Sequence, residues 1–237
     1  MSTYGHRTGS TTLWKALQST NEMAKILAVG NGKGGVGKTT TSVTLAECFS
    51  TKKRRVFFVD ADPQGSSTRW LDRCDVPFDY SQETDLGLLQ SLTKIPGYDL
   101  IIADTTPYRD SEKLQVVAHV ADFFLMPSSP DWMDIEELIE TIKKIPVLSE
   151  KQYRVLLTLV DPRSCNRKGI FSKVVKAQSS LNSAGIPCLK SFVRRYEDFP
   201  TAHADGKVIT QVRTQSARNA ISDYRGVARE LQRIWRF

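Results

Sequence analysis

The sequence predicts an α/β protein with one domain, in which a mostly parallel, twisted central sheet carries helices on both faces. Two short apolar runs, Ile26–Val29 and Leu100–Ala103, are typical of strands that are buried on both sides. Segments with helical spacing of apolar residues, such as 41–52 and 217–235, are interspersed with runs of this kind. Strands that alternate with helices favour a parallel sheet. The length of 237 residues suits one such domain.

Composition narrows the class of protein further. No apolar run approaches the roughly 20 residues that a membrane-spanning helix needs, and the N-terminus lacks the apolar core of a signal peptide. We therefore expect a cytoplasmic protein. The four cysteines form no C-x-x-C pair, which favours reduced thiols over a metal or disulfide framework. The net charge of +7 is compatible with a polyanionic partner, although many basic proteins bind none.

The segment Gly32–Thr39 has the phosphate-loop pattern G-x-x-x-x-G-K-[ST]. It follows the first apolar run and precedes the helical segment 41–52, which is the strand–loop–helix setting that the motif requires. Glycines let backbone N–H groups turn toward phosphate oxygens, and the helix N-terminus adds the positive end of its dipole. We expect Lys38 to bind the β- and γ-phosphates and Thr39 to bind Mg²⁺. The expected nucleotide-binding residues are Gly32, Lys33, Gly34, Gly35, Val36, Gly37, Lys38, Thr39 and Thr40.

Three aspartates follow or end predicted strands. Asp60 and Asp62 come directly after the apolar run 56–59, and Asp104 ends the run that begins at Leu100. Ligands of open α/β sheets bind outside the carboxyl ends of the strands, so these carboxylates are expected beside the phosphate loop. A lone aspartate at such a place could simply cap a helix. Two aspartates, two residues apart and beside a phosphate loop, favour a functional site.

Lys33 is a second lysine that the general loop pattern does not require. With it, the segment Lys33–Thr39 resembles the deviant Walker A motif of the ParA/MinD group of dimeric ATPases. Asp60–Gln64 is similar to that group's Asp-x-Asp-Pro-Gln motif, and Leu100–Asp104 is similar to its Walker B strand. The resemblance covers about residues 25–237. It implies a single phosphate-loop domain that uses ATP and Mg²⁺ as cofactors.

The resemblance also implies roles for individual residues. Lys33 would cross the interface of an ATP-dependent homodimer and bring positive charge to the partner's phosphates, in the manner of an arginine finger. Asp62 would orient the attacking water, so the catalytic residues would be Lys33, Lys38 and Asp62. The Mg²⁺ ligands would be Thr39, Asp60 and Asp104. The residues of two nucleotide-sensing switches would be Gln64, Ser66 and Ser67 in the first, and Thr105, Thr106 and Pro107 in the second.

Other segments complete the expected domain. Residues 1–24 are expected to form a flexible extension, and residues 25–237 form the ATPase domain. Asp131 is expected to cap an amphipathic helix that runs to about Ile145. In relatives the loop after the strand 154–160 borders the nucleotide base. By that resemblance, the candidates for the adenine side are Asp161 and Pro162.

The basic surplus is concentrated at the C-terminal end, where residues 186–237 contain ten Lys or Arg and five Asp or Glu. In relatives, basic residues of this region bind duplex DNA without sequence preference, and neutralisation of phosphates makes such binding strongly salt-dependent. A solvated basic rim would show the same bias. The candidates for DNA contact are Arg194, Arg195, Lys207, Arg213 and Arg218.

The last helix, at about 217–235, allows an alternative. A basic amphipathic helix can lie on an anionic membrane, as the C-terminal helix of MinD-like relatives does. However, Leu231 and Ile234 continue the spacing of a core-facing helix, and only Trp235 and Phe237 look surplus. An iron–sulfur reductase relative ranks last, because such relatives need interface cysteines near the switches, and Cys74 and Cys165 do not stand in matching places.

These features predict a partition or positioning ATPase. Its ATP-bound homodimer would bind nonspecific duplex DNA, and a ParB-like or cargo adaptor protein would stimulate hydrolysis and release. The protein would segregate a plasmid or another cargo and would be associated with the nucleoid in the cytoplasm. A membrane-associated positioning ATPase remains the alternative.

Overall fold

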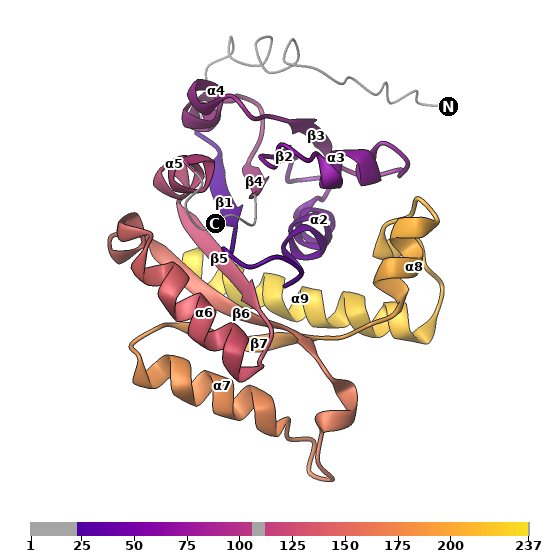
Figure 1. The fold of residues 1–237 in the computed structure, drawn as a ribbon. Helices are drawn as coiled ribbons and strands as arrows, with labels where there is room; N and C mark the ends of the chain where they lie inside the picture. The colour runs from indigo at the N-terminus through magenta and orange to yellow at the C-terminus, as the bar shows by residue number, and fades with distance from the viewer. Residues whose placement is uncertain (1–22, 106–111, 237) are drawn as a thin grey trace.

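A computed structural model describes residues 23–105 and 112–236. Within these residues, seven strands form one parallel sheet in the order β3-β2-β4-β1-β5-β6-β7 (Figure 1). The predicted fold class is confirmed. The strands are β1 (Lys25–Val29), β2 (Val56–Asp60), β3 (Asp79–Gln82), β4 (Leu100–Asp104), β5 (Phe123–Ser128), β6 (Gln152–Val160) and β7 (Cys188–Arg194).

Helices cover both faces of the sheet. The α-helices are α2 (Lys38–Phe49), α3 (Ser66–Leu71), α4 (Leu86–Gln90), α5 (Glu112–Val120), α6 (Trp132–Lys143), α7 (Ser172–Ser183), α8 (Asp198–Ala204) and α9 (Gln215–Trp235). Short 3₁₀ turns span Leu92–Lys94, Pro146–Ser149, Pro162–Ser164 and Ile209–Gln211. One apolar layer joins the sheet to α2, α3 and α9, and the other joins it to α4, α5, α6 and α7.

The central strands β2, β4 and β5 are buried at every residue, as their unbroken apolar runs indicate. Their register places the site. Asp60 at the end of β2 pairs with Asp104 at the end of β4, and Asp104 pairs with Val29 at the end of β1. The carboxyl ends of these three adjacent strands therefore bring two aspartates next to the start of the phosphate loop.

The boundaries of one helix differ from the sequence expectation. The helix after the phosphate loop begins at Lys38 and ends at Phe49, whereas 41–52 was expected. Gly37, in the left-handed region at φ 83°, ends the loop, so the helix starts at once and includes the last motif residues.

Asp131 occupies the N-cap position of α6, but the expected side-chain cap is absent. Its carboxylate accepts a hydrogen bond from Lys173 Nζ of α7 at 2.6 Å instead. An ion pair between neighbouring helices has replaced a local bond to the backbone, a choice that only the packing of α6 against α7 determines.

Trp235 also differs from the sequence expectation. It is only 9% exposed and its ring lies 5.5 Å from that of Phe123 between centroids, so it belongs to the core and is not surplus apolar surface. Phe237, Thr106, Pro107 and the expected extension 1–24, except for its last two residues, lie outside the described residues. Among the described helices, none is both long and apolar enough to cross a membrane.

Candidate functional site

The phosphate loop leaves β1 and enters α2 with its backbone fixed on two sides. Gly35 and Gly37 have φ values of 75° and 83°, a region that side chains disfavour. Buried Asn31 donates from Nδ2 to the Pro127 carbonyl at 2.7 Å and accepts from the Lys33 N–H at 3.1 Å. Thr158 Oγ1 of β6 donates to the Val36 carbonyl at 2.8 Å. The loop is thus held in shape by β5 and β6, through Asn31 and Thr158, which the sequence pattern did not indicate.

Lys38, the first residue of α2, lies inside this loop. Its Nζ donates to the Lys33 carbonyl at 2.7 Å, and the side chain is buried. Burial lowers the pKa of the ammonium to about 8, although Asp104 and Asp62 oppose the shift. The group is therefore mostly charged at neutral pH and lies at the point where anionic oxygens would enter the loop.

Asp104 joins β4 to the first turn of α2. Thr39 Oγ1 donates to Asp104 Oδ2 at 2.8 Å, and Ser42 Oγ donates to Asp104 Oδ1 at 2.8 Å. Burial raises the pKa of the carboxyl to about 7. Ser42 was missed in the sequence, although it stands three residues after Thr39 and so shares its helical face.

Asp60 and Asp62 form the neighbouring part of the site. Asp60 is fully buried, and its Oδ1 accepts from the Asp62 N–H at 3.1 Å. The Asp62 carbonyl accepts from Gln82 Nε2 of β3 at 3.0 Å, which ties the segment after β2 to the sheet edge. The three aspartates that the sequence singled out are therefore together, at the same edge as Lys38.

A cavity of about 650 Å³ opens in front of the loop. One wall contains Gly34, Gly37, Lys38, Thr39 and Asp62, as expected. A second wall was not expected, and it includes Thr158 and Leu159 from β6, Val193 and Arg194 from β7, Arg195 and Tyr196 from the loop after β7, and Phe199 from α8. Leu159 adopts φ 54°, an unusual value for a residue other than glycine, and such strain often marks a ligand site.

Asp161 and Pro162 are not among the residues that line this cavity. Asp161 is bound to Arg163, which donates from Nε and Nη2 at 3.0 Å and 2.9 Å. These bonds lower the pKa of the Asp161 carboxyl to about 2. The adenine-side role of both residues stays a prediction. The second wall of the cavity comes from β6, β7, the loop after β7, and α8.

Lys33 is held by its own chain. Its Nζ donates to Asp134 and lies 3.3 Å from Glu137, both on α6, and Ser129 Oγ donates to Asp134 at 2.6 Å. The hydrogen bond to Asp134 raises the pKa of Lys33. The side chain therefore points across the face of the domain toward α6 and does not reach into the loop.

The five basic candidates near the C-terminus are placed differently. Arg194 forms a two-point ion pair with Asp223 of α9, at 3.0 Å and 2.8 Å. Lys207 lies 3.3 Å from Asp205, and Arg218 donates to Gln215. Arg195 and Arg213 are exposed.

The donor set fits a magnesium–nucleotide complex. A hydroxyl and a carboxylate already meet at Thr39 and Asp104, and these oxygens are the ligands that Mg²⁺ prefers. The described residues contain no group of three or more His, Cys, Asp or Glu side chains that could enclose a metal. Mg²⁺ commonly binds one or two carboxylates together with substrate phosphates.

Comparison with known proteins defines the class. The model of the CobQ/CobB/MinD/ParA nucleotide binding domain matches residues 27–209. Maintenance of carboxysome distribution protein A of Gloeobacter kilaueensis is 45% identical over 214 residues, covering 90% of this chain and 96% of that protein. The protein of the same name from Halothiobacillus neapolitanus is 31% identical and covers 83% and 92%. The structure of a Cyanothece McdA variant in complex with ATP has a TM-score of 0.67 and 16% identity, covering 89% and 97%.

The chain therefore belongs to the CobQ/CobB/MinD/ParA family of nucleotide-binding domains, and it is an ATPase of that family. The TM-score of 0.67 shows that its fold is that of the McdA structure. The parallel sheet of the described residues agrees with this assignment.

Proposed function

We propose that this protein is a positioning ATPase whose ATP-bound homodimer binds nonspecific duplex DNA and leaves it when an adaptor protein stimulates hydrolysis. The observation that carries the proposal is Lys33, a second lysine that a phosphate loop does not need, whose ammonium is bound at α6 by Asp134 and Glu137. The high similarity to proteins named for carboxysome distribution supports a carboxysome as the cargo, in place of a plasmid.

The chain's own residues suit phosphoryl transfer to water. The loop N–H groups and Lys38 would hold the β- and γ-phosphates, and Mg²⁺, when bound through Thr39, Asp60 and Asp104, would neutralise phosphate charge. Asp62 would orient the attacking water from its position on the cavity wall. Few proton transfers are needed, so positioning and charge stabilisation supply most of the catalysis.

Lys33 would act only in the dimer. There its ammonium would leave Asp134 and Glu137 and approach the phosphates of the partner subunit. Its side chain is 32% exposed and that of Asp134 is 18% exposed. Ion pairs at this depth contribute modestly, on the order of 1 kcal/mol, so phosphate contacts could replace them. Each subunit would then complete the other's site, which makes nucleotide state a switch for dimer formation.

The deciding experiment measures retention of the purified protein on random-sequence duplex DNA with Mg²⁺–ATP and with Mg²⁺–ADP, over a salt series. We expect retention with ATP alone and a steep loss of affinity as salt rises, because phosphate contacts release counterions. Equal retention without nucleotide, or none at low salt, would refute DNA binding as the switched activity. Carboxysome spacing in a carboxysome-bearing host, with and without this protein, tests the cargo.

A further inference from the structure

Helix α3 is bound to the aspartates of the nucleotide site at its beginning. Asp60 Oδ2 accepts two hydrogen bonds from Thr68, the third residue of the helix, from its N–H at 2.9 Å and from Oγ1 at 3.1 Å. Gly65, the N-cap residue, has φ 60°, and a Cβ there would lie 2.8 Å from Gln82 Nε2. Any displacement of the Asp60 carboxylate would therefore act directly on α3.

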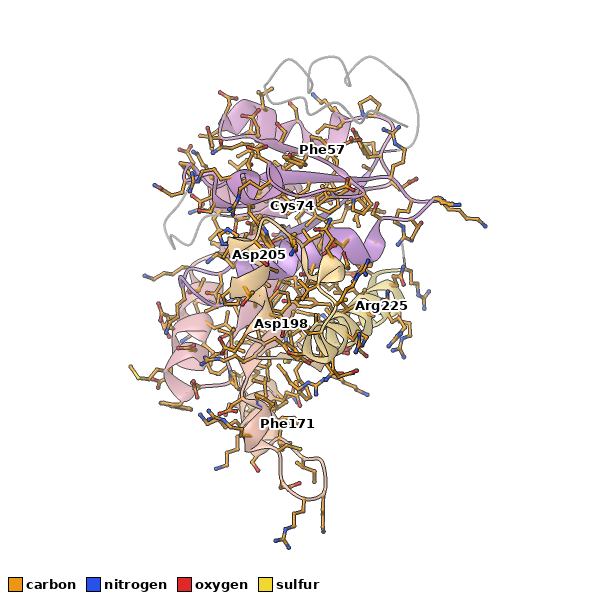
Figure 2. All side chains as sticks on the ribbon, turned by 90° about the vertical axis from the view of Figure 1, so that its right-hand side faces the viewer. Phe57, Cys74, Phe171, Asp198, Asp205 and Arg225 are labelled. Atoms are coloured by element: carbon orange, nitrogen blue, oxygen red, sulfur yellow. The ribbon has the colours of Figure 1, made fainter. Side chains whose placement is uncertain are left out.

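The other end of α3 is bound to the basic C-terminal region. Buried Trp70 donates from Nε1 to the Lys207 carbonyl at 3.0 Å, across 137 residues of sequence. Arg73 Nη2 donates to the His203 carbonyl at 2.7 Å, and the Trp70 ring meets the His203 ring edge-on at 5.2 Å. Cys74, three residues after the end of α3, and Asp205, at the end of α8, are both labelled in Figure 2 on the side of the molecule that faces the viewer.

Gly206 brings the two backbones into close approach. It has φ 64°, and a Cβ at this position would lie 3.1 Å from both Arg73 Cβ and the Arg73 carbonyl oxygen. The turn that carries Lys207 therefore rests directly on Arg73, two residues after the end of α3. Close-packed contacts of this kind transmit a displacement instead of absorbing it.

We propose that α3 and Arg73 form a connector that carries nucleotide state from Asp60 to the basic turn Gly206–Lys207, with Trp70 and Arg73 as positioning residues. This inference rests on the proposed function, because it assigns the route by which ATP controls the DNA-binding surface. A change at Asp60 on nucleotide binding moves Thr68, α3 moves as one short unit, and the turn follows through Trp70 and Arg73.

Hydrogen exchange tests the connector without DNA. We compare amide protection of residues 205–210, which do not line the cavity, in the full chain with Mg²⁺ and a non-hydrolysable ATP analogue, and with Mg²⁺–ADP. Wild type should show a nucleotide-dependent difference there. In Arg73→Ala and Trp70→Phe the difference should fall to less than about a third of the wild-type value, since local opening is no longer linked to α3. Arg73 is exposed, so its variant keeps the core intact.

Trp132→Phe is the matched control for Trp70→Phe, because Trp132 is 64% exposed at the start of α6 and lies outside the connector. It should keep the full nucleotide-dependent difference. No difference in wild type, or a full difference in both Arg73→Ala and Trp70→Phe, would overturn the connector.

DNA retention separates this inference from the function on which it rests. If wild type is retained with ATP and not with ADP, Arg73→Ala should bind the nucleotide normally but lose most of that contrast. If wild type is not retained with ATP at low salt, the proposed function fails, and the exchange measurement still decides whether α3 connects the two regions.

Discussion

Lys33 has one set of partners in the structure and would have a second set in the proposed dimer. It lies in the phosphate loop, beside the site that attracts anions, but in the isolated chain its ammonium bonds to Asp134 and lies near Glu137. These two carboxylates on a neighbouring helix satisfy the charge in the structure. The proposed dimer would exchange them for the partner's phosphates, which suits a switch better than a permanent structural ion pair.

Replacement of Lys33 by alanine tests this role. Lys33→Ala should bind ATP within a few-fold of wild type, because Lys38 and the loop N–H groups remain. ATP turnover should fall by about 10³-fold, the range known for a charge supplied across an interface. Phosphate release and nucleotide affinity are measured side by side, with Lys143→Ala on the exposed face of α6 as the control. Normal turnover in Lys33→Ala would contradict the proposed mechanism.

Glu47 is a buried acid that the proposed mechanism does not use. Thr210 donates to its Oε1, whereas Oε2 has no hydrogen-bond partner in the described structure. Burial raises the pKa of Glu47 from 4.5 to about 7. Because the folded-state pKa is the higher one, the folded protein retains this proton between those pH values. The contribution of Glu47 to stability therefore falls as pH rises through that window.

Glu47→Gln removes this titration. Relative to wild type, the variant should gain about 2 kcal/mol in unfolding free energy between pH 5 and pH 8, since a neutral amide pays no ionisation cost. Urea unfolding at both pH values measures the difference, and the exposed Glu150→Gln controls for loss of one negative charge. A difference between Glu47→Gln and wild type that is the same at both pH values would show that Glu47 does not titrate there.

At the scale of elements, α9 is a closing helix of the core. Its buried residues include Tyr224, Val227, Leu231 and Trp235, and the Tyr224 hydroxyl lies 3.0 Å from Thr41 Oγ1 in α2. Packing on α2 and β7 accounts for its apolar face. This arrangement removes Trp235 from the apolar surface on which the membrane alternative depended.

Trp235→Ala should therefore lower the unfolding free energy by about 3 kcal/mol, the usual cost of removing a large buried aromatic side chain. Arg233→Ala, on the exposed side of the same helix, should change it by less than about 0.5 kcal/mol. Denaturant unfolding measures both. If Trp235→Ala left the unfolding free energy unchanged and abolished binding to anionic vesicles, the membrane alternative would be restored.

Arg194 of β7 and Arg213 of the loop before α9 should differ in their effects on stability and on DNA binding. Arg194→Ala should lower stability by about 1–3 kcal/mol, because Asp223 loses its two-point partner while it remains largely buried. Exposed Arg213→Ala should leave stability unchanged and reduce the slope of log affinity for DNA against log salt by about 1. Unfolding and DNA titrations on both variants check this. A wild-type slope in Arg213→Ala would remove Arg213 from the proposed DNA surface.

At the scale of the whole molecule, the proposed dimer is a two-fold assembly in which each chain supplies Lys33 to the other. Asp62→Ala should trap it, because ATP binds but the attacking water is not oriented. With Mg²⁺–ATP, sedimentation should show twice the chain mass of 26.6 kDa, and the trapped species should stay on DNA. With Mg²⁺–ADP it should return to the monomer. Normal hydrolysis by Asp62→Ala would show that another residue orients the water.

Much of the fold and half of the site follow from local patterns. The phosphate loop, the buried strands and the aspartates at their ends are short segments whose roles do not depend on distant residues. A parallel sheet then brings all carboxyl ends to one edge, so Asp60, Asp62, Asp104 and Lys38 had to meet. The far wall of the cavity, with Tyr196 and Phe199, could not be found this way, because no motif relates β7 and α8 to the loop.

The sequence by itself determined that this protein is a phosphate-loop α/β protein with an extra lysine in the loop, because those signals lie within a few consecutive residues. Only the tertiary structure decided the long-range contacts. It paired Lys33 with α6, placed Trp235 in the core, left Asp161 outside the cavity and joined α3 to the Lys207 turn. Such contacts depend on how helices pack on the sheet, and the free energy that selects them is shared among many residues far apart in the chain.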